Sequence, residues 1–448
     1  MRHRLIPLIT GVLVLATSVF SADISNATSF TAPGDSKGYC NQSVTLGTGT
    51  TVSDSITGAN CVVKFTGAGT YTWIRPAYIS KIRVLVIGGG GGGGGDYGGG
   101  GGAGGFIDST IAISISTQNF SLYVANGGAG HAGNSNATPA ANGETSTAFG
   151  FSAIGGGGGG SPEANITGSA GGSGGGAGTG TDNTSGASGT TGQGYGGGTS
   201  RIYGGQTVQS GGGGGAGQLG GNGSYSSSNA LGGLGGNGLT SDITGVSTYY
   251  SGGGGGGTHT GNGSCSNAAS SGGNTGGGAS GGLGGGGAAG QCLANNLGSG
   301  TGNAGANGAA NTGGGGGGGA VQSGRTTNAH GGNGGSGVVI ISYAYISSAA
   351  PVLTLPNGQS PIFRAAIALT ATSPVDGYVT FYFQGKRIPG CSRIAMTISG
   401  SNFQAVCNWR PSTHSIANIS ASIVPKDTFA PSATGQARFL PAPRVGTR

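Results

Sequence analysis

The sequence predicts a mainly β protein: a β-sandwich-like base carries a long glycine-rich insertion, and a second, small β-sandwich follows. Three observations lead to this prediction. Apolar residues alternate with period two in several segments, which is typical of strands with one buried face. Of the 112 glycines, 96 lie within residues 88–335. Beyond the first twenty residues, no segment has the apolar period of an amphipathic helix.

The chain opens with the features of an export signal. The first four residues, MRHR, are basic, residues 5–20 are apolar, and Ser21 offers a cleavage position. An apolar segment of this length is typical of a signal peptide and is short for a membrane span. We therefore predict a signal peptide over residues 1–21 and an extracellular or cell-surface location.

The strands of the base are predicted on both sides of the glycine-rich region. Alternating apolar side chains occur in residues 61–126, in part of 144–154 and in 336–346. These faces must meet to be buried, so the glycine-rich region is expected to begin and end close together in space. We assign residues 61–346 to one glycine-rich domain and residues 22–60 to an N-terminal extension.

The glycine runs themselves predict an ordered bundle. An isolated polyproline-II helix has no internal hydrogen bonds, so runs such as Gly88–Gly95 and Gly313–Gly319 can satisfy their backbone groups only against one another or against water. We therefore predict polyglycine-II-like, left-handed three-fold helices that lie side by side. Disorder is the alternative, because ordering glycine has a large entropic cost.

The last hundred residues have an ordinary composition and dense alternation, for example over Val379–Phe383 and Phe403–Trp409. Several strands at roughly ten-residue spacing, with Pro and Gly between them, are typical of a small sandwich. We place this sandwich at residues 362–436, after a linker over 347–361 and before a tail over 437–448.

The six cysteines fall into three pairs that are close in sequence. An even number in an exported chain is typical of disulfides, and the absence of CxxC spacing disfavours zinc. Local pairing is the simplest of the fifteen connectivities that six cysteines allow. The predicted pairs are Cys40 with Cys61, Cys265 with Cys292, and Cys391 with Cys407.

Charged residues are scarce and unevenly distributed. Without the signal peptide, 16 basic and 11 acidic residues remain, a net charge of +5. Residues 88–335 have a net charge of −4, and residues 336–448 have a net charge of +7. The basic residues are spread along predicted strands and are not clustered with stacking aromatics, so we expect no nucleic-acid partner. A weak attraction to an anionic cell wall is the most that this charge implies.

No constellation of residues indicates catalysis, a metal ion or a cofactor. The five histidines lack HExxH or other ligand spacing. Residues 84–88 run into glycines as a dinucleotide fingerprint does, but no helix former follows them. We therefore predict a non-enzymatic protein without cofactors. The C-terminal residues contain no apolar tail, so no transmembrane anchor is predicted.

Short motifs at both ends of the glycine-rich region carry a resemblance to a known family. They are Cys61-Val-Val-Lys-Phe65, Gly69-Thr-Tyr-Thr-Trp73, Val84-Leu-Val-Ile-Gly88, Asn142-Gly-Glu-Thr-Ser146 and Gly334-Gly-Ser-Gly-Val-Val-Ile-Ile341. Residues 60–346 resemble the glycine-rich domain of bacterial surface proteins and phage tail fibres. This resemblance implies an architecture and a surface location, and it does not imply catalysis.

A second set of residues lies in the C-terminal part of the chain. It consists of Gly377, Val379, Phe381, Gly385, Ile388-Pro-Gly-Cys391, Ala405-Val-Cys407, His414, Asp427 and Phe429. With these residues, the segment 350–436 resembles the immunoglobulin-like repeats of bacterial surface proteins. It departs from them at Ser412-Thr413 and at residues 424–427, which affects the expected local turns.

Three functions fit these features. The leading hypothesis is a secreted or cell-surface scaffold that displays loops for adhesion, with a glycan or cell-envelope component as the ligand. A purely structural wall or matrix spacer is the first alternative, and an ice-binding surface, which the irregular repeat disfavours, is the second. Exposed tyrosines serve binding surfaces, although they can also cover the bundle. The tyrosines in question are Tyr195, Tyr203, Tyr225, Tyr249 and Tyr250.

Overall fold

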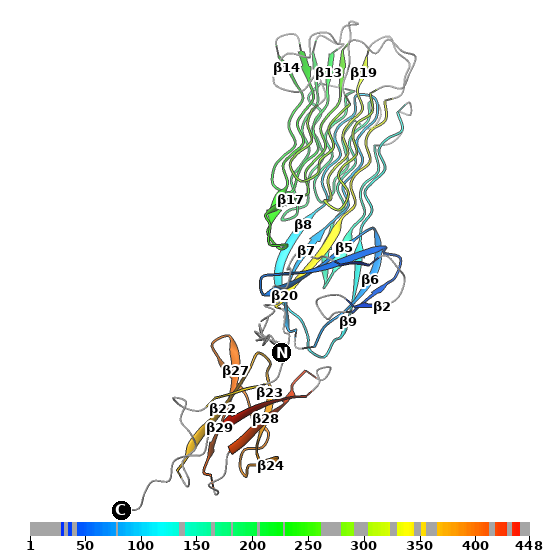
Figure 1. The fold of residues 1–448 in the computed structure, drawn as a ribbon. Helices are drawn as coiled ribbons and strands as arrows, with labels where there is room; N and C mark the ends of the chain where they lie inside the picture. The colour runs from blue at the N-terminus through cyan, green and yellow to red at the C-terminus, as the bar shows by residue number, and fades with distance from the viewer. Residues whose placement is uncertain are drawn as a thin grey trace, which may run out of the picture.

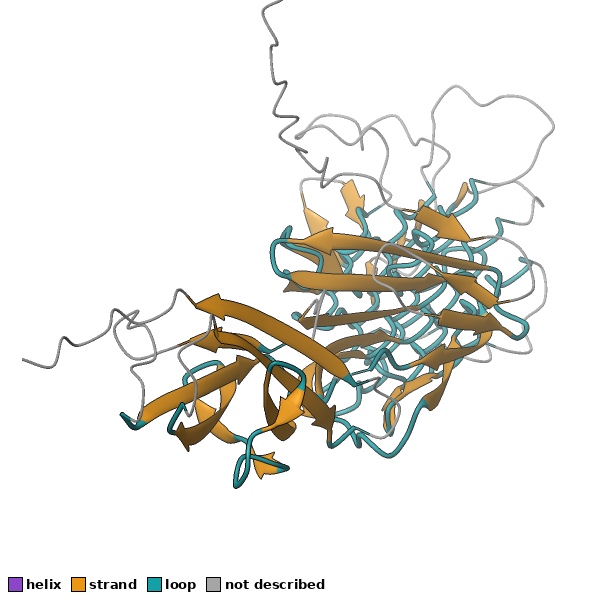
Figure 2. Ribbon diagram, turned by 60° about the horizontal axis from the view of Figure 1, so that its bottom comes forward, coloured by secondary structure: helices purple, strands orange, loops and turns teal. Residues whose placement is uncertain are grey.

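The structure is a computed structural model in which every regular element of the described residues is a β-strand (Figure 2). The described residues are 28–30, 35–37, 43–77, 79–133, 139–162, 166–180, 182–203, 207–226, 229–260, 279–290, 303–322, 329–344, 351–354, 365–411, 417–427 and 432–439. The predicted mainly β class is confirmed.

Two six-stranded sheets form the base of the molecule (Figure 1). In spatial order, the first contains β1 (Thr28–Phe30), β4 (Thr51–Thr57), β5 (Asn60–Thr66), β20 (Val338–Ala344), β7 (Lys81–Ile87) and β8 (Phe106–Ala112). The second contains β11 (Phe151–Ala153), β10 (Ser146–Ala148), β9 (Asn119–Val124), β6 (Gly69–Ile74), β3 (Ser43–Leu46) and β2 (Asp35–Lys37). The strands that flank the glycine-rich region, β7 and β20, are therefore neighbours in one sheet.

The alternating residues of these strands form the main core. Phe65, Tyr71 and Trp73 are almost completely buried there, together with Val84 and Val339 from the strands on either side of the insertion. Burying one side chain of this kind stabilises the fold by roughly 1.5–3 kcal/mol. The alternation that predicted the base is thus the pattern of contact between its two sheets.

The base begins upstream of residue 61, within the segment predicted to be an extension. β3 pairs with β6, and β4 pairs with β5 along its whole length. Val44 and Val52 are buried in the main core. The polar residues threonine, serine and aspartate make up most of β4, which explains why its apolar period is weak in the sequence.

Strands β7 and β20 are buried on both faces. On the face away from the main core, Leu85 and Ile340 belong to a second apolar cluster with Ile243 and Tyr250. These two partners come from the hairpin region of β16 (Leu239–Ser241) and β17 (Thr248–Tyr250). Tyr250 therefore covers the sheet and does not offer a binding surface.

Extended glycine runs rise from the base side by side (Figure 1); we call them the glycine bundle. In the run Gly88–Gly95, every third N–H donates to the same neighbouring run at 2.8–3.1 Å. The donor–acceptor pairs are Gly88–Gly105, Gly91–Gly102 and Gly94–Gly99, then Gly89–Glu144 and Gly92–Ala141, and finally Gly90–Gly335 and Gly93–Gly332. This period is that of a helix with three residues per turn.

The carbonyl groups of the same run serve three further neighbours. They accept hydrogen bonds from the runs around residues 128–131, 156–159 and 316–319. One run thus has six hydrogen-bonded neighbours, and none of Gly88–Gly95 has a positive φ. The bundle is ordered by backbone pairing between runs, because glycine provides no side chain to bury.

The spacing of the runs requires glycine. A Cβ atom placed on Gly91 would lie 2.2 Å from the carbonyl oxygen of Gly157, and one on Gly254 would lie 2.0 Å from that of Gly316. Both distances are far below a van der Waals contact. A side chain at these positions would push the backbones apart and break the hydrogen bonds between them.

Asparagine side chains complete the pairing at the rim of the bundle. Five exposed asparagines, each followed by a glycine, accept a hydrogen bond at Oδ1 from the N–H of an adjacent run, at 2.8–3.0 Å. The five residues are Asn142, Asn222, Asn237, Asn307 and Asn333. A rim N–H that has no further run beside it thereby still finds a protein acceptor.

The C-terminal sandwich also consists of two sheets. One contains β21 (Val352–Thr354), β22 (Ile367–Ser373), β27 (Asn402–Trp409) and β26 (Thr397–Ser399). The other contains β24 (Lys386–Arg387), β23 (Gly377–Phe383), β28 (Ala417–Pro425) and β29 (Ala433–Phe439), with β25 (Ile394–Ala395) beside β23. β21 pairs with β22, and β29 pairs with β28. The sandwich therefore extends on both sides of the predicted range 362–436.

The C-terminal sandwich contains the predicted disulfide between Cys391 and Cys407, whose Cα atoms are 5.6 Å apart. The two cysteines do not lie on adjacent strands of one sheet. Cys391 follows β24, and its carbonyl accepts the N–H of Phe381 in β23, whereas Cys407 lies on β27 of the opposite sheet. The bond therefore fastens the two sheets to each other.

Replacing both Cys391 and Cys407 by serine is expected to lower the free energy of unfolding of the C-terminal sandwich by about 3 kcal/mol. The oxidised bond closes a short loop of the unfolded chain and so reduces its conformational entropy. Denaturant unfolding of the wild type and of the double serine variant, both without reductant, measures the difference. Equal midpoints for the two proteins would contradict the expected stabilisation.

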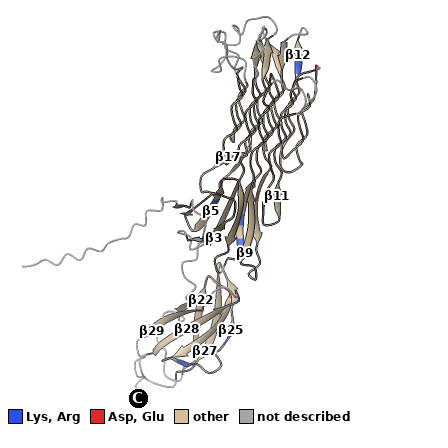
Figure 3. Cartoon of the chain, turned by 90° about the vertical axis from the view of Figure 1, so that its right-hand side faces the viewer, with Lys and Arg blue, Asp and Glu red and all other residues tan. Residues whose placement is uncertain are grey.

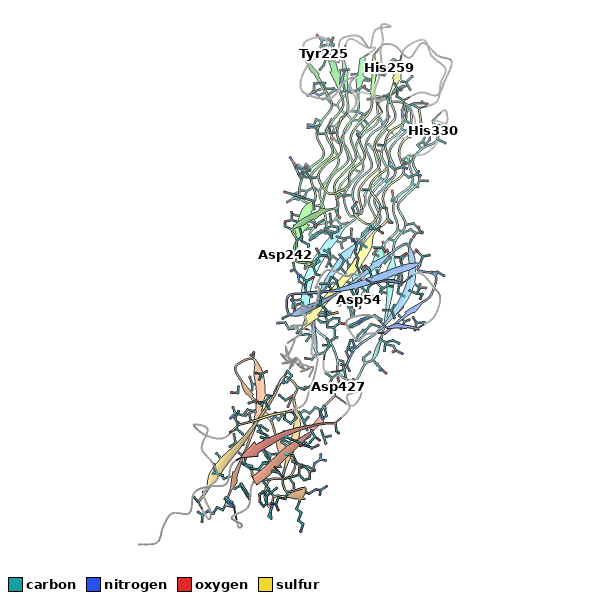
Figure 4. The ribbon with its side chains drawn as sticks, viewed as in Figure 1. Asp54, Tyr225, Asp242, His259, His330 and Asp427 are labelled. Atoms are coloured by element: carbon teal, nitrogen blue, oxygen red, sulfur yellow. A yellow bond between two sulfur atoms is a disulfide. The ribbon has the colours of Figure 1, made fainter. Side chains whose placement is uncertain are left out.

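One buried ion pair joins the base to the C-terminal sandwich (Figure 4 labels Asp427). Arg75 follows β6, and Asp427 follows β28; both are almost completely buried. The guanidinium donates to the two carboxylate oxygens at 2.6 and 3.0 Å. Its remaining donors reach the carbonyls of Pro76, Ile79, Ile115 and Thr117. Such a fully bonded pair can fix the orientation of two domains.

Candidate functional site

The far end of the glycine bundle carries short strands, which we call the tip (Figures 1 and 4). One sheet of the tip contains β12 (Arg201–Tyr203), β13 (Thr207–Gln209), β18 (Thr258–Thr260) and β19 (Val321–Gln322). A separate hairpin of β14 (Ser224–Ser226) and β15 (Asn229–Leu231) lies next to it. The tip is thus built from segments that leave the bundle at different places.

The pairing of β12 with β13 places three side chains on one face. Arg201 lies opposite Gln209, and Tyr203 lies two residues along from Arg201, so all three share a face of the hairpin. Tyr225 of the neighbouring hairpin stacks on Tyr203, with ring centroids 4.1 Å apart and planes 13° apart. Together these residues line a cavity of about 310 Å³.

Gln209 is the unusual member of this cavity. The residue is fully buried, and neither its Oε1 nor its Nε2 atom has a hydrogen-bond partner among the described residues. Burying an amide without partners costs roughly 1–3 kcal/mol. The backbone around it is well paired, since Gln209 lies opposite both Arg201 and Thr258. The unpaired amide therefore belongs to a residue that lines the cavity.

Arg201 brings positive charge to a part of the molecule with very little of it. Figure 3 shows the blue of a basic residue at β12, in a bundle with almost no other charged residues. The carboxylate of Asp182 lies beside this strand. It accepts hydrogen bonds from the N–H of Ile202 at 3.0 Å and from the N–H and the side-chain amide of Asn183. No ion pair of Arg201 occurs within the described ranges. Its guanidinium is exposed at the edge of the cavity.

A larger cavity, of about 400 Å³, lies on the outer face of the base beside β7 and β20. Its principal charged group, Arg83, is fully engaged by protein carboxylates. The guanidinium donates to Asp108 at 2.7 and 2.8 Å and to Asp242 at 2.7 Å. The hydrogen bond to Asp108 is the main reason why the pKa of Arg83 is raised. We interpret this network as structural, because it ties the β16–β17 region to the sheet.

Glu144 lies where the glycine bundle meets the base, next to the end of β9. Its carboxylate accepts the Tyr123 hydroxyl, the Asn126 N–H at 3.0 Å and the Asn126 side-chain amide at 3.1 Å. The hydrogen bond from Tyr123, followed by that from the Asn126 backbone, lowers the pKa of Glu144. The carboxylate is exposed, so solvent weakens each of these contacts.

The lowered pKa of Glu144 predicts a pH dependence of stability. A carboxylate whose folded pKa is depressed stabilises the fold at neutral pH, and this contribution is lost as the pH falls through the ordinary glutamate value of 4.5 and then the lower folded value. We therefore expect Glu144→Gln to weaken the base at pH 7 and to make little difference at pH 3. Thermal unfolding of both proteins across this range measures the effect; equal melting temperatures at pH 7 would contradict it.

The structure brings together only some of the residues that the sequence singled out. Cys391 and Cys407 are bonded to each other, and Cys61 takes part in a disulfide. Cys40, Cys265 and Cys292 lie outside the described residues, so the other two pairings stay predictions. Of the five tyrosines, Tyr203 and Tyr225 meet at the tip, Tyr195 and Tyr249 are exposed elsewhere, and Tyr250 is buried.

Arg201 and Gln209 were missed by the sequence analysis. A signal for them exists, because the segments 201–203 and 207–209 are separated by Gly204, Gly205 and Gln206. Two short apolar–polar segments around a Gly-Gly turn are typical of a β-hairpin. The surrounding glycine runs concealed this pattern. Which side chains then meet across the hairpin depends on the register, which the sequence does not specify.

The described part of the chain contains no group of three or more His, Cys, Asp or Glu side chains placed to bind a metal ion. The same residues include no helix with the length and apolar character of a membrane span. The geometry instead offers a small, partly aromatic cavity with one cation and one unpaired amide. Groups of these kinds occur in ligand-binding pockets.

Comparison with known proteins agrees with this architecture. No curated protein matches the chain. A family model described as a glycine-rich domain matches residues 65–295, which is just over half of the sequence. This range begins in the last part of β5 and includes the tip strands β12 to β15 and β18. The chain therefore belongs to the glycine-rich domain family.

Proposed function

We propose that this is an exported, non-enzymatic surface protein that binds its target through the tip of the glycine bundle. The observation that carries the proposal is the tip cavity, in which Tyr203 and Tyr225 stack beside a buried, unpartnered Gln209. Burying an amide with both of its polar atoms unpaired costs stability, and a ligand that pairs them would remove this cost. Ligand pockets place a small number of polar groups in mostly apolar walls, where these groups orient the ligand.

The remaining parts have supporting roles in this proposal. The bundle holds the tip away from the base by means of paired backbones, so the tip can vary without disturbing the support. The signal-peptide pattern at residues 1–21 is consistent with export. The C-terminal sandwich, which we regard as immunoglobulin-like, is joined to the base by the Arg75–Asp427 ion pair. Aromatic and arginine residues at the tip are the types most enriched at binding interfaces.

The test is binding of the mature chain, residues 22–448, to whole bacterial cells and to an array of cell-surface glycans. We expect saturable binding that is lost when Tyr203 and Tyr225 are both replaced by serine. The matched control replaces the exposed tyrosines Tyr195 and Tyr249 by serine, and it should bind as the wild type does. Absence of binding to every cell and glycan would favour a structural spacer, and thermal hysteresis would favour ice binding.

A further inference from the structure

We infer that the tip cavity binds a sugar unit that carries a carboxylate, such as a uronic acid in a surface polysaccharide. This inference rests on the proposed function, because it names the class of ligand that the tip would recognise. Three features of the cavity support it independently of one another. They are the unpaired amide of Gln209, the exposed guanidinium of Arg201 and the paired rings of Tyr203 and Tyr225.

The amide of Gln209 calls for a ligand that both donates and accepts hydrogen bonds. Its Oε1 needs a donor and its Nε2 needs an acceptor, and both atoms are unpaired within the described part of the chain. A pair of neighbouring sugar hydroxyl groups supplies both functions. An apolar ligand would leave the amide unsatisfied, and a simple anion such as sulfate would satisfy only its donor.

The rings of Tyr203 and Tyr225 give the cavity an apolar wall. They stack on each other, which holds both in place and leaves an outer ring face for a ligand. The C–H groups on one face of a sugar ring can lie against such a surface, while the hydroxyl groups point to the amide. Two χ angles per tyrosine make this wall rigid at a small entropic cost.

Arg201 adds the requirement for negative charge. It lies directly opposite Gln209 in the hairpin, so the two side chains leave the hairpin on the same face, and both residues line the cavity. A guanidinium binds a carboxylate with two parallel hydrogen bonds, a geometry that a neutral sugar cannot use. Asp182 stands nearby but is occupied by backbone and side-chain N–H donors of Ile202 and Asn183. The volume of about 310 Å³ is large enough for one sugar unit.

The test compares acidic sugars with neutral counterparts that differ only at the carboxylate. The probes are methyl glucuronide and methyl galacturonide, with methyl glucoside and methyl galactoside as controls, and binding to the mature chain is followed by calorimetry and saturation-transfer NMR. We expect at least one acidic probe to bind at least tenfold more tightly than its neutral counterpart. Arg201→Gln should remove this preference.

Gln209→Met separates a binding role from a structural one. Methionine has a similar size and no hydrogen-bonding requirement, so this variant should keep or raise the melting temperature while it weakens binding of the acidic probe at least tenfold. Tyr249→Ser, which changes an exposed tyrosine away from the tip, should leave probe binding unchanged. Lower stability of Gln209→Met with unchanged binding would assign Gln209 to the fold and overturn the inference.

The failure of this inference can be told apart from the failure of the proposed function. If neither acidic probe binds while the mature chain still binds cells through Tyr203 and Tyr225, the ligand class is wrong and the tip remains the binding surface. If the neutral sugars bind equally well and Arg201→Gln has no effect, the requirement for a carboxylate is wrong. If cell binding does not depend on the tip, both proposals are wrong.

Discussion

Replacing Gly91 by alanine is expected to destabilise the glycine bundle by about 4 kcal/mol, above the usual range for an overpacked site. The new Cβ atom would lie 2.2 Å from the carbonyl oxygen of Gly157. No side chain can rotate away to relieve this contact, because the neighbouring atoms are backbone. Moving the runs apart would break hydrogen bonds such as that from Gly91 N–H to the carbonyl of Gly102. Amide hydrogen exchange across the bundle measures the loss.

Gly196→Ala is the matched control for this prediction. A Cβ atom at Gly196 would lie 3.0 Å from the carbonyl oxygen of Ala187 and no closer than 3.7 Å to anything else. Gly196 is partly exposed, so its run has room to shift. We expect this variant to lose less than about 1 kcal/mol. Equal exchange protection in the two variants would mean that the runs are not as closely spaced as the structure shows.

The second large effect is expected at the junction between the base and the C-terminal sandwich. Arg75→Met should destabilise the protein by about 3–5 kcal/mol, because it leaves the Asp427 carboxylate buried without its partner. It also removes the donors for four backbone carbonyls of the base. Chemical unfolding measures the stability. Small-angle scattering should show a broader distribution of interdomain distances.

A second variant distinguishes the ion pair from the rest of this network. Asp427→Asn keeps the shape of the side chain and removes its charge. It should loosen the junction while leaving the carbonyl contacts of Arg75 in place, and therefore destabilise the protein less than Arg75→Met does. If scattering from both variants equals that of the wild type, the pair does not determine how the domains are arranged.

The fold class and most of the base could be predicted from the sequence because strand periodicity is a local signal. The alternating residues of β7, β9 and β20 stand out against the glycine-rich background. β4 did not, because threonine and serine occupy most of its positions. The glycine runs predicted three-fold helices on grounds of chemistry, since pairing between runs satisfies backbone groups that would otherwise need water.

The candidate site and the domain junction could not be predicted in the same way. Arg75 and Asp427 are separated by 352 positions, and neither has a local motif that points to the other. Tyr203 and Tyr225 meet because two hairpins emerge next to each other from the bundle, which depends on the order of the runs in space. Gln209 is conspicuous only for the lack of partners around it, a property that no sequence pattern encodes.

The central position of β20 has a consequence for biosynthesis. β20 lies between β5 and β7 in the first sheet of the base, although it is made about 250 residues after β7. Until residues 338–344 have been synthesised, β5 and β7 cannot be joined, and each presents an open edge. Forming contacts between such distant segments is slow. A chain of this design must therefore pass through a stage in which the glycine runs have been made, the sheet is still incomplete, and its exposed edges are open to neighbouring molecules.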